Sequence, residues 1–164
     1  GLWGYNIGDT VKFVSINPYK IIVSGRIKHF TSAFGEHVIS EEVELSLKKT
    51  IEQISAQVNE FHVAPQVSPK KGLPYHEWLI EFEKEPLNID AFEKLIDLHL
   101  QQLNSYYKDL VKGGVLQPLK ITTLSKKCFR IYMKSIGKLG GQNKVPRLSN
   151  DRQLADSLKK INGK

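Results

Sequence analysis

Apolar positions near the start of the chain fall into two short runs that predict paired strands. Residues 10–14 and 19–23 are rich in β-branched and aromatic side chains, and Asn17-Pro18 lies between them. Apolar runs separated by a turn dipeptide are typical of a β-hairpin. We therefore expect a hairpin over residues 10–23.

Further strands are expected in the middle of the chain. Residues 59–67 and 78–83 are apolar runs, and the stretch between them, 68–74, is rich in turn residues. This break is short enough to be a loop rather than a domain linker. Residues 119–123 predict one more short strand.

Apolar residues spaced by three or four positions predict helices in the remaining segments. The first begins at Ser40, a candidate N-cap, and its apolar side consists of Val43, Leu47, Ile51, Ile54 and Val58. The second is a long helix that begins at Asp90, with Glu93 as its capping-box partner, and ends at Gly113-Gly114.

Two shorter helices are expected near the end of the chain. One extends from Ser125 to Gly137, and the other is capped by Asn150. The alternation of strands and helices favours one mixed α/β or α+β layer sandwich over residues 1–164.

Composition bounds the class of protein. The chain has 164 residues, of which 40% are apolar and 25% charged, as in one globular domain. No apolar run approaches the roughly 20 residues that a membrane helix requires, so no membrane partner is expected. Cys128 is the only cysteine, which excludes internal disulfides and favours a reducing compartment such as the cytoplasm. Gly1 replaces an initiator methionine, so we expect a cut fragment or a processed tag.

The charge is concentrated toward the C-terminus. The net charge is +7, but residues 112–164 contain 13 Lys and Arg against two Asp, a balance of +11, and the first 111 residues sum to −4. A basic segment of this kind suits a polyanionic partner such as nucleic acid or a nucleotide, or it forms solvated helix faces.

The sequence lacks the signatures of several classes of active site. The histidines have no spacing typical of a metal site, so no metal is expected at His29, His37, His62, His76 or His99. The chain has no G-x-S-x-G elbow and no G-x-x-x-x-G-K-[ST] phosphate loop. Cys128 follows Lys126 and Lys127, but we expect a buried structural thiol there.

Two small constellations could bind a nucleotide. Asp9 follows Gly8 at the mouth of the predicted hairpin, where a carboxylate could accept hydrogen bonds from two ribose hydroxyls, or form part of a plain turn. Lys144 lies in the glycine-rich stretch 140–147, where its ammonium could reach a phosphate, with Arg147 bracing the loop, or simply be solvated.

Motifs in the first third of the chain resemble those of adenylate-forming enzymes. Residues 4–11, GYNIGDTV, are similar to the Y-x-x-G-D motif of that superfamily. Residues 23–28, VSGRIK, followed by GEHV at 35–38 and EEVE at 41–44, resemble its hinge motif.

Later strings resemble a narrower group, the Gretchen Hagen auxin-responsive family of acyl acid amido synthetases. These strings are LNSYY at 103–107, PLKI at 118–121 and GQNKVPR at 141–147. The string HEWLIEF at 76–82 is similar to a bacterial member. The likeness covers nearly the whole chain, from Gly4 to Arg147.

The resemblance implies an α+β lid domain: an N-terminal β-hairpin followed by a small mixed sheet flanked by helices. Residues 1–164 would be the single C-terminal domain of a larger enzyme whose N-terminal domain binds ATP, Mg and the acid. That enzyme would adenylate a carboxylic acid and transfer the acyl group to an amino acid, whereas the fragment alone would be inactive.

The resemblance also assigns roles to individual residues. Asp9 would hold the ribose hydroxyls, Arg26 would support the same nucleotide, and Lys28 would be the hinge. Lys144 would be the catalytic lysine that reaches the α-phosphate. The loop 31–36 would be exchanged with Lys144 at the site after the lid rotates.

Two other classes of function remain open at this stage. The +11 segment could serve a stand-alone nucleic-acid-binding module, although its cations are dispersed over two helices and a loop and no glycine-aromatic RNA-binding signature is present. A protein-interaction domain could use Leu2, Trp3 and the aromatic helix as its contact surface.

Overall fold

A computed structural model of the chain describes residues 9–26, 30–140 and 143–163. Its centre is a three-stranded sheet of β5 (Gln57–Gln66), β6 (Tyr75–Lys84) and β7 (Lys120–Leu124), in the order β5-β6-β7. β6 is antiparallel to β5 and parallel to β7, so the sheet is mixed. The predicted strands 59–67, 78–83 and 119–123 are confirmed within three residues at each end.

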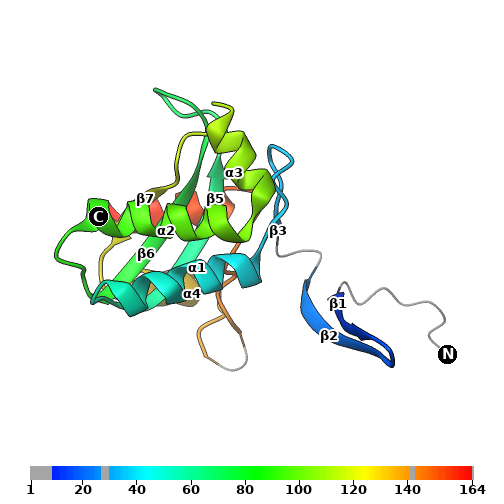
Figure 1. Cartoon of the computed structure of the whole chain (residues 1–164). Coiled ribbons are helices and arrows are strands. Elements are labelled where there is room, and N and C mark those ends of the chain that lie inside the picture. The colour runs from blue at the N-terminus through cyan, green and yellow to red at the C-terminus, as the bar shows by residue number, and fades with distance from the viewer. Residues whose placement is uncertain (1–8, 27–29, 141–142, 164) are drawn as a thin grey trace.

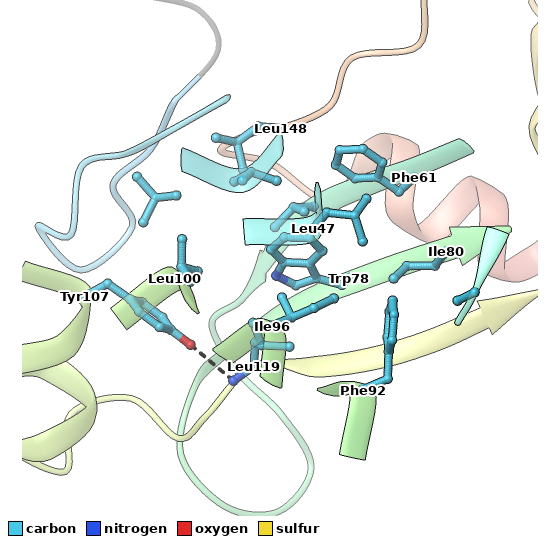
Figure 2. Close-up of a cluster of buried hydrophobic side chains, with 14 of the residues drawn as sticks. Leu47, Phe61, Trp78, Ile80, Phe92, Ile96, Leu100, Tyr107, Leu119 and Leu148 are labelled. Atoms are coloured by element: carbon cyan, nitrogen blue, oxygen red, sulfur yellow. Dashed lines mark hydrogen bonds between the residues drawn. The ribbon is translucent and has the colours of Figure 1, made fainter. Parts of the chain in front are cut away.

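One face of the sheet is covered by α1 (Ser40–Gln53) and α2 (Ile89–Leu103), which lie side by side in Figure 1. The side chains of Trp78, Ile80 and Phe82 alternate along β6 toward this layer, and all are buried. Figure 2 shows Trp78 at the middle of this cluster, where its ring stacks on Phe61 with centroids 5.9 Å apart. Because burying each such side chain contributes roughly 1.5–3 kcal/mol, this cluster supplies much of the driving force for folding.

The opposite face is covered by α4 (Cys128–Ser135) and α5 (Gln153–Asn162). A second buried cluster joins these helices to the sheet; it consists of Ala64, Leu79, Leu124, Cys128, Phe129, Leu154, Ala155 and Leu158. β6 is therefore buried on both faces, and the predicted layer sandwich is an α+β arrangement of helices, sheet and helices.

The predicted N-terminal hairpin is confirmed as β1 (Asp9–Ile16) and β2 (Tyr19–Arg26), which pair antiparallel. Figure 1 shows it extending away from the sheet and helices. Among its described residues, none belongs to either buried cluster. Many of its apolar side chains are exposed: Val11, Phe13, Val14, Ile16, Tyr19, Ile21, Ile22 and Val23.

A second, shorter ribbon joins the hairpin to α1. β3 (Phe30–Thr31) pairs antiparallel with β4 (Val38–Ile39), and the chain turns between them. Gly35 has a φ of +88° in this turn, a conformation that glycine adopts without strain. No helix in the described part of the chain is both long and apolar enough to span a membrane.

The long helix predicted from Asp90 to Gly113 is instead two helices, α2 and α3 (Ser105–Lys112). Asn104 interrupts it with an extended backbone, φ −125° and ψ 108°, and its Oδ1 accepts a hydrogen bond from the Tyr107 N–H. The apolar spacing continues across the break, so periodicity could not reveal it. Capping of α3 by Asn104 therefore interrupts the helix, although the apolar spacing is that of one continuous helix.

The predicted caps of α1 and α2 were also wrong. The N-cap of α1 is Ile39, and Ser40 is the first helical residue. The N-cap of α2 is Asn88, whose Oδ1 accepts from the Ala91 N–H at 2.9 Å, rather than Asp90. Glu93 is not a capping-box partner, because its carboxylate accepts from the Ile121 N–H on β7.

The last two helices begin later than predicted. α4 starts at Cys128 rather than Ser125, since the Glu81 carboxylate accepts from the N–H groups of Lys127 and Phe129. α5 starts at Gln153, because the side chain of Asn150 accepts from Ser32 instead of capping the helix.

Candidate functional site

Lys144 lies on the loop that connects α4 to α5 and is exposed. Within the part of the chain that the structure describes, its side chain forms no hydrogen bond or ion pair. It lines a cleft of about 670 Å³ between this loop, the start of α1 and β5. An exposed cation beside a cleft can bind an anionic ligand that approaches from solvent.

Arg147, three residues later, is held by the body of the domain. Its guanidinium forms an ion pair with Glu60 and lies over the Phe61 ring, 4.6 Å from the centroid. Its Nε is 3.9 Å from the Glu44 carboxylate on α1. Burial lowers the pKa of Arg147 from its ordinary value, and the charge of Glu44 opposes that change. Arg147 is thus a structural cation, unlike Lys144.

The backbone around Arg147 adds a short parallel bridge to the edge of β5. The Val63 N–H donates to the Arg147 carbonyl at 2.9 Å, and the Ser149 N–H donates to the Val63 carbonyl at 3.0 Å. Leu148 between them is buried in the first cluster, beside Phe61 and Leu47 in Figure 2. The loop therefore has a fixed C-terminal end.

The predicted exchange loop, 31–36, is packed onto the domain. The buried Glu36 carboxylate is 2.9 Å from Nε2 of the buried His76, and its other oxygen accepts from the Phe34 N–H. Burial alone would raise the pKa of Glu36, but the hydrogen bond and charge of His76 and the backbone N–H groups lower it below 4.5. The contact between Glu36 and His76 therefore joins this loop to β6.

The two loops are also joined to each other. The Thr31 hydroxyl donates to the Ser149 carbonyl at 2.8 Å, and the Ser32 N–H donates to the Asn150 side chain at 2.8 Å. Thr31 is fully buried. The β3–β4 ribbon and the lysine loop therefore belong to one body.

The predicted nucleotide-binding pair lies at the open end of the hairpin. Asp9 and Arg26 are directly opposite each other in the register of β1 and β2, although 17 positions separate them in the sequence. The structure thus brings these two backbone positions together, while Lys144 lies on a separate loop. Lys28, the predicted hinge, and Leu2 and Trp3 lie outside the described residues.

Two other expectations from the sequence concern Cys128 and a metal site. Cys128 is buried and its thiol contacts the Leu158 carbonyl, and burial together with Glu81 raises the pKa of the thiol. The predicted buried structural thiol is confirmed. Among the described residues, no cluster of three His, Cys, Asp or Glu is arranged to hold a metal ion.

Part of the C-terminal basic charge is used inside the fold. Glu77, 2% exposed, forms ion pairs with Arg152 at 2.5 Å and with Lys159 at 2.8 Å. Lys126 pairs with Glu83 on the surface. These ion pairs offset part of the basic charge of this segment, which weakens the basis for a nucleic-acid interface.

Sequence reasoning missed the residues that position the lysine loop, above all Glu60 and His62. His62 is fully buried, and its Nδ1 is 2.7 Å from the Pro146 carbonyl. A histidine on an apolar strand indicates a buried polar contact, but its partner lies 84 positions away and could not be inferred.

Comparison with known proteins identifies the family. A model of the GH3 family C-terminal domain matches residues 41–153, which include Lys144 and Arg147 but not Asp9, Arg26 or Lys28. The chain matches no curated protein.

Two solved structures share the fold. A structure described as GH3.15 acyl acid amido synthetase superposes with a TM-score of 0.76 at 18% identity, covering 99% of this chain and 32% of that one. A structure of AtGH3.15 acyl acid amido synthetase in complex with 2,4-DB gives 0.73 at 17% identity, covering 98% and 31%. The chain spans about a third of the length of these structures. The family model covers more than half of the chain, and the protein therefore belongs to the GH3 family through the C-terminal domain of that family.

Proposed function

We propose that this chain is the mobile C-terminal lid of an ATP-dependent acyl acid amido synthetase. The observation that carries the proposal is the family match over residues 41–153, which places Lys144 in a GH3 C-terminal domain. The solved structures that share the fold bear the name acyl acid amido synthetase and are about three times as long.

The hairpin β1–β2 supports a partner domain in the same protein. Its apolar side chains are exposed, with Ile16 77% and Tyr19 78% exposed, and a two-stranded hairpin is marginally stable alone. We propose that the hairpin packs against an N-terminal domain that binds ATP and the acid, so that residues 30–163 form the body of the lid.

Lys144 would act in the first half-reaction. The carboxylate of the acid attacks the α-phosphorus of ATP, an O–P bond forms, and pyrophosphate leaves. Negative charge builds on the phosphoryl oxygens, so a fixed cation in a closed site stabilises the transition state more than the ground state. Lys144 is exposed and forms no ion pair with the described residues, which suits this role, whereas Arg147 is paired with Glu60.

In the second half-reaction the amine of an amino acid attacks the acyl carbon. The C–N bond forms, the C–O bond to AMP breaks, and the amine loses its proton. The lysine would have to withdraw before the amine enters, which accounts for its place on a lid. Asp9 would hold the ribose and Arg26 the same nucleotide, and their opposed positions on the hairpin suit a shared ligand.

Any Mg bound with ATP would be held mainly by the N-terminal domain. The described residues contain no acidic or histidine cluster suited to a metal, whereas Lys144 and Lys138 at the cleft are suited to phosphate. Magnesium would supply charge neutralisation of the phosphates. The chain without its N-terminal domain should show no turnover.

The experiment measures each half-reaction in the full-length protein carrying Lys144→Ala. Acid-dependent exchange of pyrophosphate into ATP reports adenylation, and amide formation from a supplied acyl-adenylate reports transfer. We expect adenylation to fall on the order of 10²-fold and transfer to change little.

Lys160→Ala is the matched control, because it removes an exposed lysine from the same basic third of the chain, on α5. Both half-reactions should stay at the wild-type rate in this variant. Equal loss of adenylation and transfer in Lys144→Ala would refute the assigned role.

A further inference from the structure

The loop that carries Lys144 is fixed on the C-terminal side of the lysine. Before it, Gly140 adopts a φ of +91°, a conformation in which glycine imposes no strain. After it, Pro146 fixes its own φ and restricts Val145 to extended conformations. The position of the Lys144 backbone therefore depends on what holds residues 146–149.

Four consecutive residues of β5 hold that segment. Glu60 forms an ion pair with the Arg147 guanidinium, and the ring of Phe61 packs against the same guanidinium. Val63 forms backbone hydrogen bonds to the residues on both sides of Leu148. His62 contacts the Pro146 carbonyl, two residues from Lys144. We call Glu60, Phe61, His62 and Val63 the β5 clamp.

Only one tautomer of His62 can form the hydrogen bond to the Pro146 carbonyl. A carbonyl oxygen only accepts, so Nδ1 must carry the proton. Burial lowers the pKa of His62 below its ordinary value, so the ring is neutral and Nδ1–H is fixed toward Pro146. The other nitrogen, Nε2, is buried without a hydrogen-bond partner in the described part of the chain.

The clamp itself is backed by the core. The Phe61 ring under Arg147 stacks on Trp78, with the two planes 13° apart, and Trp78 is fully buried on the central strand. The ring on which the Arg147 guanidinium lies is therefore held in place by the core.

We propose that Arg147 and His62 are positioning residues for the Lys144 ammonium, which they act on through the backbone of residues 145–147 without contacting the substrate. This inference rests on the proposed role of Lys144. A catalytic group must lie within about 0.5 Å of its productive position, and a displacement of about 1 Å can cost 10²-fold in rate.

The first test is Arg147→Met in the full-length protein, which keeps the apolar stem and removes the charge. We expect the turnover rate of pyrophosphate exchange to fall about tenfold, with the KM for ATP and the transfer half-reaction unchanged. Lys126→Met is the matched control, because it removes a cation that pairs with Glu83 at the surface, and it should change neither half-reaction.

The second test combines Arg147→Met with Lys144→Ala. If Arg147 acts only by placing Lys144, the double variant should be no slower in adenylation than Lys144→Ala alone. A further loss in the double variant, or equal loss of both half-reactions in Arg147→Met, would overturn the inference. A normal adenylation rate in Lys144→Ala would instead overturn the proposed function.

Variants of His62 decide the matter independently if Arg147→Met does not fold. Asn places an amide N–H close to where the histidine Nδ1–H lies, whereas Leu fills the space without a donor. We expect His62→Asn to retain most adenylation activity and His62→Leu to lose about tenfold, with transfer retained in both. Equal adenylation rates in the two variants would count against the positioning role.

Discussion

At the scale of single residues, Glu77 is a buried carboxylate with three hydrogen-bonding partners. Its two oxygens bind Arg152, Lys159 and the Thr122 hydroxyl, and the residue is 2% exposed. It thereby ties α5 to the sheet across the second buried cluster. Burial alone would raise the pKa of Glu77, but the hydrogen bonds from Lys159, Thr122 and Arg152 lower it below 4.5.

We expect Glu77→Gln to destabilise the protein by about 2 kcal/mol at neutral pH, because its cationic partners lose their counter-charge while remaining partly exposed. A carboxylate with a lowered folded pKa stabilises fully above its unfolded value and loses that contribution as pH falls toward the folded pKa. The difference between wild type and Glu77→Gln should therefore be constant above about pH 5.5 and shrink below pH 4.5.

Urea unfolding followed by circular dichroism between pH 3 and pH 8 measures this difference. Glu83→Gln on the same strand is the control, since Glu83 pairs with Lys126 at the surface and should contribute little at any pH. A difference for Glu77→Gln that does not depend on pH would contradict the explanation.

Asp9 gives a second prediction at this scale. If its carboxylate holds the ribose hydroxyls, Asp9→Ala in the full-length protein should weaken ATP binding about tenfold or more, since hydrogen bonds to a charged acceptor contribute roughly 1.5–3 kcal/mol. Calorimetric titration with ATP measures the change, and Asp151→Ala on the lysine loop controls for loss of negative charge. Unchanged affinity for ATP in Asp9→Ala would remove the ribose role.

Candidate site residues could be named from the sequence where a local motif carried them, and their roles stay predictions. Lys144 stands in a glycine-rich basic stretch and Asp9 follows a glycine, so each is visible within a window of a few residues. The Glu36–His76 pair spans 40 positions and the His62–Pro146 contact spans 84, and each joins a strand of the sheet to a loop that is distant in the sequence. No local pattern encodes such pairs.

At the scale of elements, Asn104 joins three segments at the break between α2 and α3. Its Oδ1 caps α3 at the Tyr107 N–H, and its Nδ2 donates to Glu42, whose carboxylate also accepts from the Ile39 N–H at the start of α1. Asn104 is 4% exposed. One side chain thus fixes the direction of α3 relative to α1.

The break also places Tyr107. Its hydroxyl donates to Asp97 on α2 at 2.6 Å, and it accepts from the Leu119 N–H just before β7, the bond drawn in Figure 2. Burial and the adjacent charge of Asp97 raise the pKa of Tyr107 well above its ordinary value, so the hydroxyl stays a donor. A continuous helix would carry Tyr107 away from both partners.

We expect Asn104→Ala to lower the free energy of unfolding by about 2–3 kcal/mol, because it removes a cap and leaves buried polar groups unpaired. Asn88→Ala is the matched control: it removes the exposed cap of α2 alone and should cost about 1 kcal/mol. Thermal and urea unfolding of both variants measure the costs. Equal costs would show that the bond from Asn104 to Glu42 contributes nothing.

Periodicity predicted every strand of the central sheet and most apolar positions of the helices. It extended the first helix wrongly to Ile54 and Val58, because α1 ends at Gln53 and Val58 lies on β5. It failed at helix ends, where the deciding partner is distant: Glu81 starts α4, and Ser32 draws Asn150 away from α5. At the break between α2 and α3 the deciding group is local, because Asn104 caps α3 at the Tyr107 N–H. The starts of α4 and α5 are thus set by tertiary hydrogen bonds, whereas those of α2 and α3 are set by local asparagine caps.

At the scale of the whole molecule, the described residues separate into a packed body and a hairpin. The body contains both buried clusters, the β3–β4 ribbon and the lysine loop, and the bonds from Thr31 and Ser32 to residues 149 and 150 join the last two. If the body rotates, the loop 31–36 and Lys144 must move together. A rotating lid of this kind would bring one of the two loops to the active site while it carries the other away.

The resemblance assigns the pivot of this rotation to Lys28, between the hairpin and the ribbon. Proline at this position would hold φ near −65° and remove the backbone N–H, so a rotation that needs a change of φ would be blocked. We expect Lys28→Pro in the full-length protein to retain pyrophosphate exchange within about threefold and to lose amide formation on the order of 10²-fold, because only the second half-reaction requires the rotated lid.

Lys28→Ala separates the backbone effect from the loss of the ammonium, since alanine leaves φ free. This variant should form the amide at close to the wild-type rate, and a single-turnover assay from preformed acyl-adenylate measures it without the first step. Normal amide formation by Lys28→Pro would place the pivot elsewhere. Equal loss in Lys28→Ala would instead assign Lys28 a role for its charge, because a pivot depends on backbone freedom and not on an ammonium group.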